Sequence, residues 1–111
     1  MTNKCRVIYS PEAVDDIKSI YRYIAYDIKS VRNAEAQINR IRSKISKLDL
    51  FPKKFVQVEW EPWASMGLHQ MPVDNYLVYY LIKEREQLVI IVRIFYNGQN
   101  IELIINEEKE D

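Results

Sequence analysis

Two apolar runs separated by a short charged break most constrain how this chain can fold. Residues 76–82 and residues 88–95 are rich in β-branched and aromatic side chains, and Lys83-Glu-Arg-Glu-Gln87 lies between them. Each run is too short to span a membrane and too prone to extended structure for a helix. We therefore predict two adjacent antiparallel strands at the centre of a sheet.

The residues before these runs predict two amphipathic helices in tandem. Ser10, Pro11 and Glu12 are residue types that begin a helix, as a cap, a first-turn proline and an acid at the positive end of the helix dipole. Apolar residues then recur at gaps of three and four over residues 14–28 and again over residues 31–48. Residues 51–52, Phe-Pro, end the second helix. Two such helices in succession predict a helical hairpin.

The remaining segments predict shorter elements around the two central strands. Residues 7–9, 55–60 and 68–73 are strand candidates, and Pro72 favours an edge or a bulge. Residues 101–105 return as a short strand or helix, and residues 106–111 form an acidic tail that frays. The order predicts an α+β domain over residues 1–105: an N-terminal strand, a helical hairpin, then a three- to four-stranded antiparallel sheet. The helices cover one face of this sheet, and the other face is free for function.

Composition narrows the function classes. A length of 111 residues fits one domain, and 16 basic and 16 acidic residues cancel, whereas dedicated nucleic-acid binders usually carry a net positive charge. Cys5 is the only cysteine and His69 the only histidine, so we expect no intramolecular disulfide, no metal site and no cofactor. The sequence shows no signal-peptide core and no apolar run of membrane length, so we expect a cytoplasmic protein with no membrane partner.

Five short strings follow one another along nearly the whole chain. They are Val7-Ile-Tyr-Ser-Pro-Glu-Ala13, Ile20-Tyr-Arg-Tyr-Ile24, Leu48-Asp-Leu-Phe-Pro52, Met71-Pro-Val-Asp-Asn-Tyr-Leu-Val-Tyr-Tyr80 and Ile91-Val-Arg-Ile-Phe-Tyr96. In this order and spacing they resemble the RelE/ParE superfamily of toxins from bacterial type II toxin–antitoxin systems. The resemblance implies a small cytosolic, growth-inhibiting toxin whose free sheet face and neighbouring edges are wrapped by a cognate antitoxin.

The superfamily contains two mechanisms, and the sequence is closer to the ParE-like wing, whose members inhibit DNA gyrase. Relatives usually follow the last-strand tyrosine with a basic string, whereas Tyr96 is followed by Asn97-Gly98-Gln99-Asn100. RelE-like members cut mRNA on the ribosome. They carry an arginine where this chain has Met71-Pro72, and a tyrosine or histidine where it has Ile104-Ile105. A ribosome-dependent mRNA endoribonuclease stays open as the alternative, as does a relative that retains only antitoxin binding.

Cleavage of mRNA by a ribose hydroxyl needs a base, an acid and a cation or hydrogen-bond donor for the phosphorane charge. The candidates are His69, Arg93 and Tyr96. His69 is either an acid or base near neutral pH or a packed strand residue, and Tyr96 is either catalytic or part of the sheet.

Arg93 is the one charged residue in the second apolar run. Strict alternation would place it on the same side as Val89, Ile91 and Phe95. It either contacts a phosphate or a partner, or it extends its charged end out of the sheet into water or pairs with an acid. The candidate acids for that pairing are Glu59, Glu84 and Glu86.

Further cations and two tryptophans are candidates for binding a nucleic acid or a protein partner. Lys53 and Lys54 follow the second helix, and they either bind phosphate or keep the loop soluble. Arg40, Lys44 and Lys47 lie on the outer face of that helix, which is either solvated or meets a partner's acidic segment or phosphate backbone. Trp60 and Trp63 either stack on a base or pack in the core or an antitoxin groove.

Overall fold

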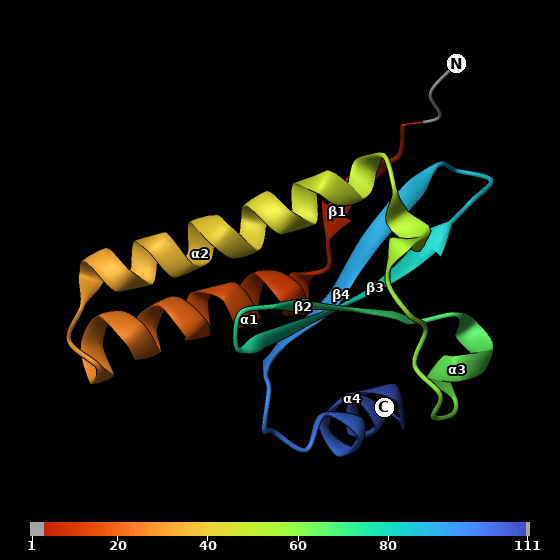
Figure 1. The fold of residues 1–111 in the computed structure, drawn as a ribbon. Helices are drawn as coiled ribbons and strands as arrows, with labels where there is room; N and C mark the ends of the chain where they lie inside the picture. The colour runs from red at the N-terminus through yellow and green to blue at the C-terminus, as the bar shows by residue number, and fades with distance from the viewer. Residues whose placement is uncertain (1–3, 111) are drawn as a thin grey trace.

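A four-stranded sheet forms the middle of the molecule in the computed structural model, which describes residues 4–110, with side chains to residue 105 (Figure 1). Its strands are β1 (Arg6–Tyr9), β2 (His69–Val73), β3 (Tyr76–Lys83) and β4 (Leu88–Tyr96), in the spatial order β1-β4-β3-β2. β3 pairs antiparallel with β2 and with β4, and β1 pairs with β4 in parallel. The two apolar runs are therefore the two central strands, as predicted, and Pro72 lies on the edge strand β2.

Helices α1 (Pro11–Arg22) and α2 (Val31–Ser46) form the predicted hairpin and cover one face of the sheet (Figure 1). Ser10 and Ser30 cap them, because each hydroxyl accepts a hydrogen bond from the backbone N–H three residues later. A π-helical turn, η1 (Tyr23–Asp27), ends the first helix before the connection. The core between the helices and the sheet contains Ala13, Ile17, Ile41, Ile45, Met71, Val78, Tyr80, Val89, Ile91 and Ile94.

A β-bulge in β4 overturns the strict alternation predicted for that strand. Tyr79 pairs with Arg93 but Tyr80 pairs with Ile91, which leaves Val92 as an extra residue. Beyond the bulge, Ile94 joins Ile91 in the core beneath the helices, and Phe95 belongs to a cluster on the other face. Strict alternation required Phe95 to lie on the same side as Ile91. The bulge places Phe95 on the opposite side.

The face expected to be free is partly covered, so that expectation is wrong. Two further helices, α3 (Trp63–Met66) and α4 (Ile101–Glu110), lie across the sheet from the hairpin (Figure 1). They contribute to a second buried cluster of Val58, Trp63, Leu68, Tyr79, Phe95, Ile101 and Ile105. The physical reason is that β3 and β4 are apolar on both faces, and a bare apolar face in water is unfavourable.

Three details concern the loops and the end of the chain. The sequence predicts a strand over residues 55–60, and this prediction is wrong. Gln57 makes only a single β-bridge, to His69, before the chain turns at residues 61–62. Short 3-10 helices, η2 (Lys47–Asp49) and η3 (Pro52–Lys54), follow α2 instead of a direct stop. Residues 101–105 are helical, the second of the two predicted alternatives. The frayed tail at residues 106–111 stays a prediction, and Asp111 lies outside the described residues.

Candidate functional site

Arg93 is held in an ion pair with Asp16 of helix α1. The Arg93 Nε and Nη2 atoms donate to the two carboxylate oxygens of Asp16 over 2.8 and 2.9 Å. The two side chains are only 12% and 13% exposed, and the guanidinium also lies 4.5 Å from the centre of the Phe95 ring. Structural pairing, one of the two predicted alternatives, is thus what the structure contains. The predicted acids on residues 59, 84 and 86 are the wrong partners, because α1 places Asp16 closer.

Asp16 also closes an open strand edge, which explains its position. β1 ends at Tyr9, so β4 has no neighbouring strand on that side beyond Ile91. Asp16 accepts a hydrogen bond from the Ile94 N–H over 2.8 Å, and the Ser10 hydroxyl donates to the Val92 carbonyl over 2.8 Å. The side chains of Ser10 and Asp16 therefore satisfy backbone groups that a longer β1 would otherwise pair. Sequence reasoning missed Asp16, since Asp15 and Asp16 both fall on the polar side of the helix pattern.

His69 is a packed strand residue in the structure. It is 6% exposed, and its ring stacks on Tyr80 with centres 5.1 Å apart. Its Nδ1 lies 2.8 Å from the Phe55 carbonyl oxygen, and since a carbonyl only accepts, Nδ1 carries the proton and donates. The Tyr80 hydroxyl donates to the Pro52 carbonyl over 2.6 Å. His69 and Tyr80 together fasten residues 52–55, which carry Lys53 and Lys54, to the sheet.

Tyr96 lies at the end of β4, away from His69. It is 53% exposed and meets the Tyr76 ring edge-to-face at 5.8 Å. Burial, with smaller contributions from the nearby Tyr96 and Tyr23 hydroxyls, raises the pKa of Tyr76. His69 pairs with Tyr80 whereas Tyr96 pairs with Tyr76, four positions along β3 and so about 13 Å along the strand. The structure does not bring the three predicted catalytic residues together.

Two of the predicted binding cations are engaged within the chain. Lys53 forms an exposed ion pair with Glu84, and its ammonium group holds the pKa of that carboxyl below its usual value. Arg40 donates to Asp74 in the β2–β3 turn over 2.8 Å. Hydrogen bonds from Arg40, and then from Gln37, lower the pKa of the Asp74 carboxyl. Both cations contact carboxylates of neighbouring segments.

The two tryptophans pack within the protein. Trp63 is 7% exposed and belongs to the second buried cluster. Trp60 packs partly buried against that cluster, with its ring 6.2 Å from that of Tyr79. Of the predicted alternatives, this arrangement favours core packing over stacking on a nucleic-acid base.

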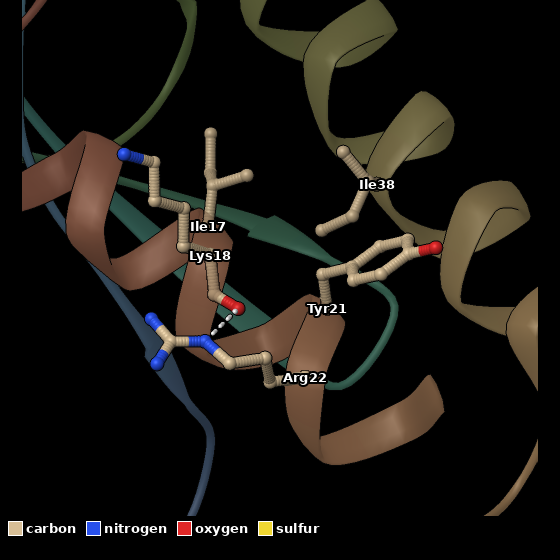
Figure 2. Close-up of a pocket in the computed structure, with 5 residues that line it drawn as sticks. All are labelled: Ile17, Lys18, Tyr21, Arg22 and Ile38. Atoms are coloured by element: carbon tan, nitrogen blue, oxygen red, sulfur yellow. Dashed lines mark hydrogen bonds between the residues drawn. The ribbon is translucent and has the colours of Figure 1, made fainter. Parts of the chain in front are cut away.

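Among the described residues, two surface cavities lie near the helical hairpin. One, of about 410 Å³, lies between α1 and α2, and Ile17, Lys18, Tyr21, Arg22 and Ile38 line it. Figure 2 shows Tyr21 and Ile38 pointing toward each other across the gap between the helices, with the Arg22 Nε donating to the Lys18 carbonyl over 3.4 Å. This opening is shallow and mainly apolar, with two cationic side chains at one side.

The second cavity, here called the lysine groove, lies at the C-terminal end of α2 and has a volume of about 330 Å³. Its cations are Lys44, Lys47 and Lys54, which come from two segments of the chain. Its apolar lining consists of Leu48, Leu50, Phe51, Phe55 and Met71. The structure thus brings together three of the cations that the sequence proposed as binding residues. Among the described residues, no group of three or more His, Cys, Asp or Glu is placed to hold a metal ion.

Comparisons with solved structures support the fold. The toxin–antitoxin structures that the chain resembles include the chromosomal ParDE system from P. aeruginosa, the RelBE2 complex from Mycobacterium tuberculosis and the RelE–RelB complex from Pyrococcus horikoshii. Their TM-scores are 0.69, 0.61 and 0.61, at 14%, 16% and 17% sequence identity. The likeness covers 86%, 84% and 86% of this chain and 98% of each of those chains. At such identities it shows a shared fold alone.

The sequence supplies the family. A search of curated proteins found no match, and none of the described helices is long and apolar enough to cross a membrane. A family model described as the ParE toxin of the parDE type II toxin–antitoxin system matches residues 7–101. The resemblance predicted from the five strings, including its lean toward ParE, is thereby confirmed. The chain belongs to the ParE toxin family of type II toxin–antitoxin systems.

Proposed function

We propose that this protein is a cytoplasmic, growth-inhibiting toxin that acts by binding a target, DNA gyrase, and that a cognate antitoxin neutralises it. Membership of the ParE toxin family supports the toxin role and the antitoxin partner. The neutral net charge supports a protein target over a nucleic acid, since the molecule as a whole has no positive field to attract a phosphate backbone.

The observation that carries the proposal is that the candidate catalytic residues make contacts within the fold and do not converge on one point. Cleavage needs a base, an acid and a cation around one phosphate. His69 is buried against Tyr80, and its Nδ1–H donates a hydrogen bond to the Phe55 carbonyl. Arg93 donates two hydrogen bonds to Asp16. Tyr96 lies about 13 Å from the His69 position, measured along the strand direction. A toxin that acts by binding needs no such constellation.

An mRNA endoribonuclease is the second candidate, and one observation favours it. Lys44, Lys47 and Lys54 gather in the lysine groove, where they could contact a phosphate backbone. The groove lacks a histidine or tyrosine among its lining residues. This mechanism would therefore need its general base from the Asp49 carboxylate, the one acidic lining residue, or from outside the groove, such as a group of the ribosome.

The test exposes the purified protein to both targets. We expect it to inhibit a gyrase supercoiling reaction and to leave mRNA intact on translating ribosomes, as read by primer extension. We expect the neighbouring gene to encode the antitoxin. The matched control is therefore the same protein mixed with the product of that gene, which should restore supercoiling. Codon-positioned cuts with normal supercoiling would establish the endoribonuclease. Inactivity in both assays and in growth, with binding to the neighbour's product intact, would mean that only antitoxin binding is retained.

A further inference from the structure

We propose that the lysine groove binds a short acidic segment of the antitoxin, with an apolar side chain in the groove and carboxylates on Lys44, Lys47 and Lys54. This inference rests on the proposed function, because it takes the existence of an antitoxin from there. It adds where on this chain a segment docks and which chemistry the segment carries.

The apolar lining of the groove is one half of the argument. Leu48 and Met71 are each 1% exposed and form its base, whereas Leu50 and Phe51 are 42% and 69% exposed. A volume of about 330 Å³ lies within the range of ligand-sized pockets, about 300–1,000 Å³. Large apolar side chains beside such a pocket gain most when another apolar group displaces water from them. The groove is therefore suited to a leucine-sized or phenylalanine-sized side chain.

The charge around the groove is the other half. Among the described residues, Lys44, Lys47 and Lys54 form no ion pair, in contrast to Lys53, which pairs with Glu84. The single carboxylate in the lining, on residue 49, lies 3.5 Å from the Lys4 ammonium group. Three exposed ammonium groups thus line an apolar opening, and none of them lies within ion-pair distance of a carboxylate among the described residues. Carboxylates on either side of an apolar anchor complement this arrangement.

The groove is also held in shape before anything binds. Phe55 in its wall is fixed through its carbonyl, which accepts the His69 hydrogen bond, and the Pro52 carbonyl accepts that of Tyr80. The Lys54 ammonium group lies 5.5 Å from the centre of the Phe55 ring, which keeps its charge at the opening. A preformed site avoids the entropy cost of ordering a loop on binding.

A protein segment fits these features better than a nucleic acid or a second copy. An apolar centre with a polar, charged surround is the usual anatomy of a protein interface. A phosphate backbone would satisfy the lysines but leave Leu50 and Phe51 in water. A second copy could offer its own acidic residues, and its mass would reveal it.

The experiment measures, by calorimetry at low and high salt, the affinity of the full-length protein for the product of the neighbouring gene. We expect Lys44→Glu combined with Lys47→Glu to weaken binding about tenfold or more and to reduce its salt dependence. Phe51→Ser should weaken binding about tenfold without changing the salt dependence. The matched control is Arg32→Glu, at the exposed N-terminal end of the same helix, which should bind within about twofold of the unmodified protein.

Each outcome decides the matter, once thermal melts show that the variants are folded. Unmodified protein that fails to bind the neighbour's product overturns the proposed function and this inference with it. Unmodified protein that binds, with groove variants that bind equally well, overturns this inference alone. The inference also fails if the groove variants lose self-association, measured by light scattering, or binding of a single-stranded RNA oligonucleotide, while they keep the antitoxin.

Discussion

Replacing Asp16 by alanine should destabilise the fold by about 3 kcal/mol, because this carboxylate holds both Arg93 and the open edge of β4. It accepts two hydrogen bonds from Arg93 and one from the Ile94 N–H, at 2.8 to 2.9 Å. Removing one partner of a buried ion pair costs about 3–5 kcal/mol. The 12% and 13% exposure of the two side chains lets some water reach the stranded groups, which puts the expected loss at the lower end.

The loss is large enough to read directly in a thermal melt. An unfolding entropy of about 2.1 cal/mol/K per residue gives roughly 230 cal/mol/K for 111 residues. A change of 3 kcal/mol then lowers Tm by about 13 °C. The matched control is Asp15→Ala, an exposed neighbour on the same helix, which should change stability by less than about 0.5 kcal/mol.

A double-mutant cycle separates the ion pair from the strand-edge bond. Combining Asp16→Ala with Arg93→Met removes the stranded charge, so the double variant should be more stable than the sum of the single losses by about 2 kcal/mol. The remaining loss reports the unpaired Ile94 N–H. An Asp16→Ala melt within about 2 °C of the unmodified protein would show that water solvates both groups, and this reasoning would then be wrong.

Three further variants test other parts of the structure. His69→Ala should cost about 3 kcal/mol and speed hydrogen exchange over residues 52–55, since the Phe55 bond and the ring stack are lost together; unchanged exchange would contradict this anchoring. Gly67→Ala should cost about 1 kcal/mol in a urea titration, because the residue has φ +78° while nothing lies within 4 Å of an added Cβ, so only backbone strain counts. Burial raises the pKa of both Tyr79 and Tyr80 from 10 to about 12. Because the unfolded chain loses these two protons near pH 10 and the folded chain only near pH 12, the free energy of unfolding falls as the pH rises from 10 toward 12. The loss is up to about 5 kcal/mol in total for the two tyrosines. In the double variant Tyr79→Phe/Tyr80→Phe, the free energy of unfolding from urea titrations should fall less steeply between pH 10 and 12 than in the unmodified protein. An equal fall in both proteins would refute the assignment of this pH dependence to Tyr79 and Tyr80.

The elements of this fold follow from local patterns, which is why the sequence predicts them. The apolar runs of β3 and β4 are interpretable from composition and length alone, and the gaps of three and four in α1 and α2 from periodicity alone. Ser10 and Ser30 cap the helices through bonds that span three residues. None of these features depends on residues distant in the chain.

The errors arise where one residue displaces a whole pattern or where distant segments meet. The extra residue Val92 moves Phe95 to the face opposite Ile91. Strict alternation of side chains along a strand does not predict such a bulge. The Arg93 partner lies 77 positions away, so no local string indicates it. The cover on the second sheet face comes largely from α3 and α4, whose short apolar strings do not reveal where they pack.

The same limit applied to the candidate site. From sequence, Arg40, Lys44, Lys47 and Lys53 are equivalent surface cations. The structure divides them by their neighbours: Arg40 meets Asp74 and Lys53 meets Glu84, whereas Lys44 and Lys47 meet no carboxylate within ion-pair distance among the described residues. Whether a cation is free for a partner depends on which acid the fold brings beside it.

This division also decides how function should be mapped. Arg93 and His69 are each either catalytic or structural in the sequence, and each supports the fold through buried contacts. Loss of growth inhibition in their variants would therefore not separate activity from unfolding. Lys44 and Lys47 are exposed and make no ion pair among the described residues, so their replacement should leave stability nearly unchanged. A loss of antitoxin binding there, with an unchanged melting temperature, would therefore report the interface itself. For this reason the lysine groove is the more decisive place to begin mutagenesis than the residues whose chemistry first suggests a catalytic role.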